Sequence, residues 1–255
     1  MSGPRRESVV AFDGTELVVH RRGPGDGGGR PVLLLHGLFS NAAMNWVRFS
    51  HAATLAEAGF EAIMPDLRAH GDSGKPHEPA AYPLGVLVRD VEAVVEALGL
   101  EQFDLVGFSL GARTAAAAAV AGLSPRRLVL AGMGLEGLGG RERRVGFFID
   151  AIDRFDEIKQ GDPAFMTMQF IKTMKIDRVA ARLLLGTLED LAPADLAALT
   201  MPTLVLCGEE DRDNGSPQSL VDALPNARLA EIPGTHMGSV TGPELGEAIA
   251  RFLTA

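Results

Sequence analysis

The chain has 255 residues, 46% of them hydrophobic and 22% charged, a composition typical of a globular protein with a sizeable core. Its formal net charge of −9 argues against nucleic acid or an anionic membrane as the main partner, because both attract basic surfaces. The single cysteine, Cys207, excludes an intrachain disulfide framework and disfavours a cysteine–metal cluster. No signal peptide is visible and no apolar run reaches the ~20 residues of a membrane span, so we expect a cytoplasmic protein without membrane insertion.

Short apolar runs alternate with helical patterns through the first half of the chain. Residues 8–12 and 17–21 are predicted to form a hairpin that turns at Asp13-Gly14. Further strands are predicted at 32–35, 60–64, 103–107 and 128–131, and helices at 46–58, 84–98 and 112–120. Strands that alternate with helices predict a doubly wound, parallel sheet with right-handed crossovers.

This alternation stops after Gly132 and returns near residue 199. Helical patterns without intervening strands fill residues 136–198, which we interpret as a helical cap inserted between core segments 1–135 and 199–255. The core then resumes with strands at 203–207 and 228–232 and helices at 216–223 and 243–253. Two polar stretches are expected to be a flexible turn, at 23–29, and a solvated charged turn, at Arg141–Arg144.

The motif Gly107-Phe108-Ser109-Leu110-Gly111 stands directly between a predicted strand and a predicted helix. A serine in this context is typical of a nucleophile elbow, a tight turn that holds the hydroxyl clear of the sheet. The two glycines suit a turn too crowded for Cβ atoms. The new helix also places the backbone N–H of Leu110 where an oxyanion would develop.

A second oxyanion donor is expected after strand 32–35, where the sequence reads His36-Gly37-Leu38-Phe39. In such a fold this strand ends beside the serine turn, and the backbone N–H of Leu38, or less favourably of Phe39, is the candidate donor. We interpret His36 itself as structural.

Taken together, five stretches resemble the α/β-hydrolase superfamily, and within it the small serine esterases with a lid. They are residues 33–40 (LLLHGLFS), 66–74 (DLRAHGDSG), 105–111 (LVGFSLG), 202–208 (PTLVLCG) with Asp211, and 232–236 (IPGTH). The resemblance covers essentially the whole chain outside the lid. It implies an α/β fold with an eight-stranded, mostly parallel sheet, and a chain order of nucleophile, acid and histidine.

The resemblance implies a catalytic triad of Ser109, Asp211 and His236. His236 is the only one of the six histidines that follows the last predicted strand, and a serine needs a base within hydrogen-bond reach. Asp211 matches the family's Gly-x-x-Asp pattern, and its role is to orient the imidazole and stabilise the imidazolium. Asp213 and Glu210 are reserve acids, and Glu136 is the alternative if the acid follows the preceding strand.

We expect the cap and the loops around Ser109 to supply an apolar substrate pocket. Its candidate residues are Phe39, Phe108, Phe148, Met166, Phe170 and Met237. The reaction predicted is cleavage of small to medium, partly apolar carboxylic esters through an acyl-enzyme, which requires no cofactor and no metal ion. The partner would be a small-molecule ester-like substrate, and the assembly a monomer or homodimer.

Other readings stay open on the same residues. Lactones, thioesters and C–C bonds are alternative substrates, although Leu38-Phe39 departs from the more glycine-rich loop usual in C–C hydrolases and from the tryptophan usual in cofactor-free haloperoxidases. A serine at position 109 argues against a resemblance to dehalogenases and epoxide hydrolases, which place aspartate at this position. A ligand receptor of the same fold with little turnover is the alternative of another class.

Overall fold

The computed structural model describes residues 3–24 and 28–255, apart from the side chains of residues 141–143. The flexible turn predicted at 23–29 therefore falls partly outside the described residues, as do most side chains of the charged run at Arg141–Arg144. None of the helices in the described ranges combines the length and the apolar character needed to cross a bilayer.

Eight strands of the described chain form a single sheet. They are β1 (Arg5–Val10), β2 (Glu16–Arg22), β3 (Arg30–Leu35), β4 (Phe60–Pro65), β5 (Asp104–Phe108), β6 (Leu128–Ala131), β7 (Thr203–Gly208) and β8 (Ala227–Ile232). Their order across the sheet is β1-β2-β4-β3-β5-β6-β7-β8. β2 pairs antiparallel with both β1 and β4, and all other neighbours pair parallel. The predicted eight-stranded, mostly parallel sheet is confirmed.

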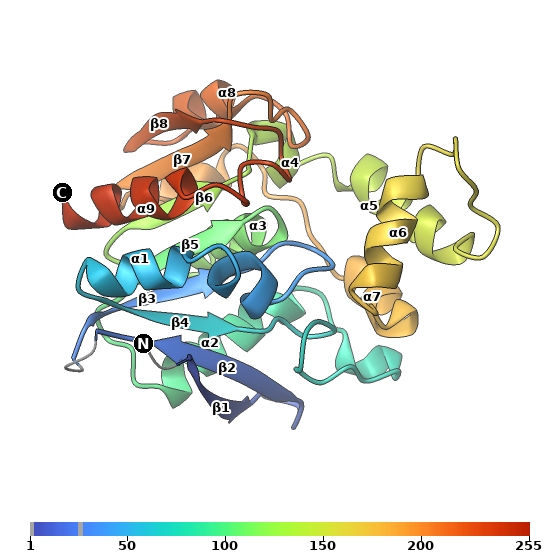
Figure 1. Cartoon of the computed structure of the whole chain (residues 1–255), viewed down its shortest axis with the longest axis horizontal. Coiled ribbons are helices and arrows are strands. Elements are labelled where there is room, and N and C mark those ends of the chain that lie inside the picture. Colours follow the sequence, from blue (N-terminus) through green and yellow to red (C-terminus); the bar gives the residue numbers. More distant parts are fainter. Residues whose placement is uncertain (1–2, 25–27) are drawn as a thin grey trace.

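Helices cover both faces of this sheet (Figure 1). The α-helices are α1 (His51–Glu57), α2 (Val86–Ala97), α3 (Leu110–Val120), α4 (Leu135–Leu138), α5 (Arg141–Asp153), α6 (Phe165–Thr173), α7 (Arg178–Leu185), α8 (Pro217–Ala223) and α9 (Glu244–Thr254). Single turns are η1 (Ala43–Val47), η2 (Pro79–Ala81) and η3 (Asp195–Ala198). α1 and α9 share one apolar core with the sheet, whereas α2, α3 and α8 share the other. The central strands are therefore buried on both sides, which explains their continuous apolar sequences.

The helix predicted at 46–58 is wrong in its first part. The chain forms the π-helical turn η1, and α1 begins only at His51. Ser50 separates them, because its φ of 65° lies in the left-handed region, where a helix cannot continue. His51 Nε2–H donates to the Val240 carbonyl at 2.7 Å, so the imidazole that begins α1 is bonded to the loop before α9.

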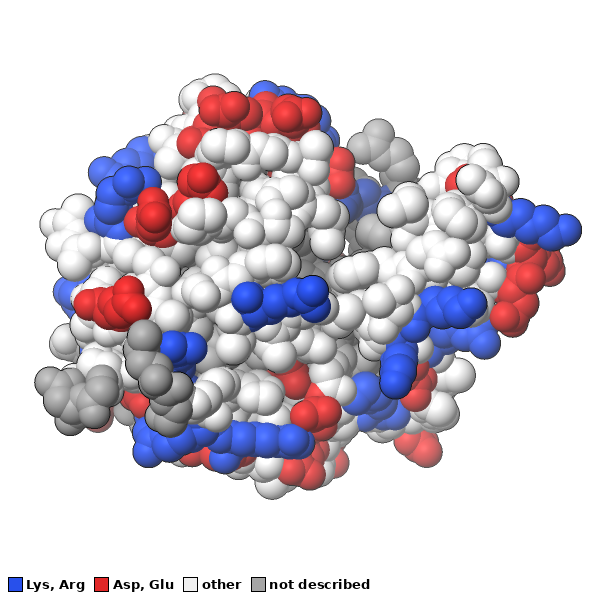
Figure 2. Space-filling view, viewed as in Figure 1, with Lys and Arg blue, Asp and Glu red and all other residues white. Residues whose placement is uncertain are grey.

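Helices α5, α6 and α7, hereafter the cap helices, stand beyond the carboxyl edge of the sheet, away from both helical layers (Figure 1). α5 packs against α6 and α7. α4 instead lies against α8, and its Gly137 N–H donates to the Asn214 carbonyl at 2.9 Å. On the face shown in Figure 2, acidic and basic side chains are interspersed over the body and the cap helices alike.

Candidate active site

Ser109 occupies the turn between β5 and α3. Its backbone has a φ of 52° and a ψ of −112°, a conformation that a non-glycine residue adopts only under strain. The strain is held by neighbouring structure, since the Ser109 N–H donates to the Ala131 carbonyl at 2.9 Å and the Ser109 carbonyl accepts from Arg113. The hydroxyl is thereby presented at the carboxyl edge of the sheet, as the motif predicts.

The glycines on either side of Ser109 are required by close backbone contacts. A Cβ at position 107 would lie 2.2 Å from the Gly111 carbonyl oxygen, and one at position 111 would lie 2.1 Å from the Leu35 carbonyl oxygen. Both distances are far below van der Waals contact, so any larger residue would push α3 away from β3 and β5. The steric role predicted for this glycine pair is therefore visible in the structure.

Ser109, His236 and Asp211 meet in one hydrogen-bonded chain. The serine Oγ lies 3.1 Å from His236 Nε2, and His236 Nδ1 lies 2.8 Å from Asp211 Oδ2. The three residues follow β5, β8 and β7, whose parallel pairing brings their carboxyl ends to the same edge. A neutral imidazole that donates from Nδ1 directs its Nε2 lone pair at the serine hydroxyl, and this arrangement can remove the hydroxyl proton as a bond forms at Oγ.

The loops that carry the acid and the histidine are packed on each other. A Cβ at Gly208 would lie 2.1 Å from the Gly234 carbonyl oxygen, and that carbonyl accepts a hydrogen bond from the Glu210 N–H at 3.1 Å. The Ser239 hydroxyl donates to the His236 carbonyl at 3.1 Å. The imidazole is thus held by its backbone as well as by Asp211.

Asp211 is set up electrostatically as an anion. Burial by itself raises the pKa of its carboxyl group, but the hydrogen bond from His236 and the backbone N–H of Asp213 outweigh burial, and the net pKa lies below the ordinary value. A carboxylate in this state stabilises positive charge on the adjacent imidazole.

The reserve acids occupy other places. Asp213 is exposed, although a carboxylate oxygen of Asp213 lies within 4.8 Å of the nearest ligand atoms of Asp211 and His236. Glu210 is exposed, and Glu136 accepts a hydrogen bond from the Ser216 N–H at the start of α8. Asp211, Asp213 and His236 also form a group of possible metal ligands among the described residues, but His236 Nδ1 is already bonded to Asp211 and His236 Nε2 to Ser109.

The two candidate oxyanion donors are the backbone N–H groups of Leu38, in the loop after β3, and of Leu110, the residue after Ser109. Among the described residues, no hydrogen bond is formed by the backbone N–H of Leu38 or of Leu110, the first residue of α3. Gly37, which precedes Leu38, approaches the serine so closely that a Cβ there would lie 3.6 Å from Ser109 Cβ. Two unpaired N–H groups beside a nucleophile are suited to bind a developing oxyanion.

Phe39, the less favoured donor, is occupied. Its backbone N–H donates to His70 Nε2 at 3.0 Å, and His70 Nδ1 in turn bonds the Arg68 carbonyl at 2.9 Å. This accepting role requires a neutral ring, and burial lowers the pKa of His70 to about 3. Sequence reasoning did not identify His70 as the partner of the Phe39 N–H, because the two residues are 31 positions apart.

His36 has the structural role predicted for it. Its Nδ1 bonds the Gly37 carbonyl at 2.8 Å, and its Nε2 accepts from the Leu67 N–H at 3.0 Å. Burial lowers the pKa of His36, so it too stays neutral. These contacts join residues 36–39, which we call the oxyanion loop because they carry a candidate oxyanion donor, to the loop of residues 66–74. They thereby fix the position of Leu38.

Gly132 was also missed by sequence reasoning. It follows β6 with a φ of 59°, and a Cβ there would lie 2.8 Å from the Phe108 ring and 3.0 Å from His236 Cε1. The Phe108 ring packs against the imidazole, with 5.0 Å between ring centroids. Gly132 therefore leaves space for both rings, and the glycine after a buried strand was the only signal available in the sequence.

The predicted pocket residues separate into two groups. Phe39 is buried beneath the cap helices. Its ring packs edge-to-face with the Phe148 ring, with 5.6 Å between the ring centroids, and Phe170 belongs to the same apolar cluster. Met166 and Met237 are instead 75% and 54% exposed. The aromatic residues thus connect the oxyanion loop to the cap helices, while a pocket role for the two methionines stays a prediction.

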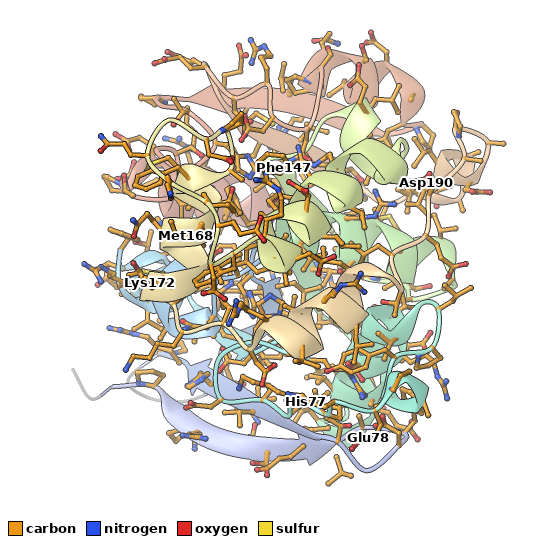
Figure 3. The ribbon with its side chains drawn as sticks, turned by 90° about the vertical axis from the view of Figure 1, so that its right-hand side faces the viewer. His77, Glu78, Phe147, Met168, Lys172 and Asp190 are labelled. Carbon is orange, nitrogen blue, oxygen red and sulfur yellow. The ribbon has the colours of Figure 1, made fainter. Side chains whose placement is uncertain are left out.

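His20 and His77 each lie against a carboxylate far along the chain. His20 Nε2 lies 3.5 Å from a carboxylate oxygen of Asp66, and His77 Nε2 lies 2.9 Å from one of Asp177, the residue that caps α7. In Figure 3, which faces the cap helices, His77 lies beside α7. Neither residue contacts Ser109 through these bonds.

Comparison with known proteins gives matches in sequence and in structure. The chain is 37% identical over 90 residues to "Epoxide hydrolase 2" of Siraitia grosvenorii, a match that covers 35% of this chain and only 27% of that protein. A solved hydrolase from Pseudomonas aeruginosa PA01 superposes with a TM-score of 0.78 at 22% identity, covering 98% of this chain and 99% of that one. An esterase from Exiguobacterium antarcticum gives 0.73 at 20% identity, covering 98% and 100%.

The structural likenesses concern the fold alone at these identities. The family assignment comes from the sequence model of the alpha/beta hydrolase fold, which matches residues 30–173 and so includes the oxyanion loop, the serine turn and the cap helices α5 and α6. More than half of the chain lies in that match, and the sheet order and helical layers agree with it. The chain belongs to the alpha/beta hydrolase fold family.

Proposed function

We propose that the chain is a serine hydrolase that cleaves carboxylic esters of small to medium, partly apolar substrates through an acyl-enzyme on Ser109. One observation carries the proposal: Ser109 Oγ, His236 and Asp211 form a continuous hydrogen-bonded chain beside two unpaired backbone N–H groups. The apolar character of the substrate is supported by Phe108, whose ring packs against the His236 imidazole, and by the Phe39–Phe148 pair where the cap helices meet the loop after β3.

In the first half of the reaction, His236 Nε2 takes the hydroxyl proton as Ser109 Oγ attacks the ester carbonyl carbon. The carbonyl oxygen becomes an oxyanion between the N–H groups of Leu38 and Leu110, and the ionised Asp211 stabilises the imidazolium. His236 then gives the proton to the departing alcohol. In the second half, His236 removes a proton from water as its oxygen attacks the acyl carbon. His236 then returns that proton to Ser109 Oγ as the bond between the acyl carbon and Oγ breaks, which releases the carboxylic acid and restores the hydroxyl.

The relatives named as epoxide hydrolases raise a second reaction for this site. Attack of Ser109 Oγ on an epoxide carbon would form an ether, which has no carbonyl carbon for the second water to attack. Attack on an ester, thioester or lactone carbonyl forms an ester to Ser109, which the same histidine and oxyanion donors can hydrolyse. The serine at the turn therefore favours acyl substrates.

Labelling and turnover test this proposal together. A fluorophosphonate probe should label Ser109 in the wild type but not in Ser109→Ala, and the wild type should hydrolyse p-nitrophenyl acetate and butyrate, with kcat/KM reduced several orders of magnitude in Ser109→Ala and His236→Ala. Labelling without turnover on a panel of esters, lactones and thioesters would instead support a ligand receptor. Diol formation from epoxides by Ser109→Ala would contradict the serine mechanism.

A further inference from the structure

Two segments join the cap helices to the core, and they lie side by side. The outgoing segment is the end of α4, residues 137–138, and the returning segment is residues 189–191. The Leu191 N–H donates to the Leu138 carbonyl at 3.0 Å, which ties them together. We call these two segments the neck. Figure 3 shows Asp190 at the border of the cap helices, and His77 on the other side of α7 from Asp190.

Both segments of the neck are bonded to one side chain, Arg113. It belongs to α3, one turn after Ser109, whose carbonyl accepts from the Arg113 N–H. One guanidinium nitrogen donates to the Gly137 carbonyl at 2.6 Å, and another donates to the Glu189 carbonyl and, at 3.0 Å, to the Asp190 carboxylate. The guanidinium is buried, with Asp190 half exposed beside it.

We propose that Arg113 is a positioning residue that fixes the cap helices over the proposed nucleophile and thereby controls how well larger acyl groups are bound. This inference rests on the proposed function, because it concerns the substrate of the same site. Arg113 does not touch the reacting atoms. It acts through the neck, which sets where the cap helices meet the oxyanion loop.

The chemistry of the side chain explains why one residue can hold both segments. A guanidinium is planar, stays charged and presents its N–H groups in a fixed fork, so it can bond two carbonyls and a carboxylate at once. A lysine ammonium is a compact donor on a flexible stem and cannot span the same three acceptors. Loss of the guanidinium would also leave two neck carbonyls without their charged donor.

Movement at the neck would be felt at the site. The cap helices reach the core near Ser109 through the Phe148 ring against Phe39, and through Arg144, which donates to the Asp213 carbonyl in the loop of the triad acid. A substrate confined to the oxyanion donors and the triad would not depend on these contacts. A long acyl chain extends beneath the cap helices, and its binding would depend on them.

The test compares Arg113→Met, which keeps the length and packing of the side chain, with Arg113→Lys and Asp190→Ala. Arg182→Met is the matched control, because Arg182 pairs with Asp153 inside the cap and does not touch the neck. Each variant is assayed with p-nitrophenyl acetate and p-nitrophenyl octanoate, is labelled with the fluorophosphonate probe, and is examined by hydrogen exchange in α5–α7.

For Arg113→Met we expect KM for the octanoate to rise about tenfold, as loss of charged hydrogen bonds implies, with kcat for the acetate and the labelling rate close to those of the wild type. Exchange in α5–α7 should rise while exchange in β5 and β6 does not. Arg113→Lys should fall between Met and the wild type, Asp190→Ala should shift KM in the same direction by a smaller factor, and Arg182→Met should leave the ratio of the two KM values unchanged.

Equal effects on both esters without faster exchange in the cap helices would overturn the inference, as would an unchanged octanoate KM in Arg113→Met. If Arg113→Met does not fold, Asp190→Ala decides, and a wild-type octanoate KM there counts against the inference. Failure of the wild type to be labelled or to hydrolyse either ester would contradict the proposed function instead, so the two failures are distinguishable.

Discussion

His70 Nε2 accepts a hydrogen bond from the backbone N–H of Phe39 at 3.0 Å, and both groups are buried. The bond removes one of the two donors that the sequence offers for the oxyanion and leaves Leu38 as the partner of Leu110. It also fixes the direction of the chain at the position where Leu38 presents its N–H. A side chain that never touches substrate thus shapes the proposed oxyanion site.

Replacement of His70 should therefore lower the rate of the chemical step. In His70→Leu the Phe39 N–H loses its acceptor and the oxyanion loop can shift, so we expect kcat for p-nitrophenyl acetate to fall by about 10- to 100-fold, less than or near the cost of losing one oxyanion donor. His70→Gln places an acceptor oxygen near the same point and should recover most of the rate. Steady-state kinetics of both folded variants check this, and equal losses in the two would contradict it.

Acid should destabilise the fold through its buried histidines. The pKa values of His36, His51 and His70 are lowered, in each case chiefly by burial, whereas in the unfolded chain these rings titrate near pH 6.5. Below that pH the unfolded state binds protons that the folded state does not, so the free energy of unfolding falls as the pH falls. Each such histidine contributes a slope of about 1 kcal/mol per pH unit between its two pKa values.

Urea unfolding of the wild type and of His70→Gln at pH 6.5, 5.5 and 4.5 measures this slope. Carboxyl groups with a lowered pKa, such as Asp66 at about 2, also begin to cost stability near pH 4.5, but both proteins carry them, so the difference between the two curves reports His70 alone. The variant should lose less stability per pH unit than the wild type. Parallel curves for the two proteins would show that His70 does not stay neutral in the folded chain.

Asp211 and Asp213 should differ sharply in their importance. Asp211→Asn removes the carboxylate that accepts from His236 Nδ1, so the imidazole loses its orienting partner and its favoured tautomer. We expect kcat/KM to fall by about 10³-fold or more, as in other triads. Asp213→Asn, the matched control on the same loop, should stay within about threefold of the wild type, because its side chain is exposed. A larger loss in Asp213→Asn would transfer the role to that residue.

Gly132→Ala should damage the site by contact with the imidazole. The new Cβ would lie 3.0 Å from His236 Cε1 and 2.8 Å from the Phe108 ring, so the ring pair must move away from Ser109. Gly99→Ala is the control, because Gly99 has a similar φ of 61° with no atom within 4 Å of the new Cβ. Both should lose about 1 kcal/mol of stability through the left-handed backbone, but only Gly132→Ala should lose activity, by about tenfold or more.

Much of the site could be predicted because each of its three side chains follows a strand, and these strands are parallel to one another. Apolar runs predict strands β5, β7 and β8, and parallel strands bring their carboxyl ends together, so the loops that follow them were expected to converge. The choice of Asp211 within its loop came from the resemblance to the family's Gly-x-x-Asp pattern. The glycines around Ser109 were predictable for a similar reason, since a turn from strand to helix leaves little space at its ends.

Other features depend on contacts between segments that the sequence does not pair. The break at Ser50 arises from backbone geometry that the helical pattern of 46–58 does not reveal. The bond between Phe39 and His70 joins residues 31 positions apart. The clearance at Gly132 depends on two rings from β5 and from the loop after β8. Each requires the packed structure, because nothing local to the residue specifies its partner.

The most direct measurement is the identity of the covalent intermediate. The wild type is mixed with excess p-nitrophenyl butyrate, quenched with acid within milliseconds, and digested for mass spectrometry. Our account predicts a burst of p-nitrophenol of about one equivalent and a butyryl group on the peptide that contains Ser109, absent in Ser109→Ala. A butyryl group on any other residue, or turnover at the wild-type rate by Ser109→Ala, would contradict it.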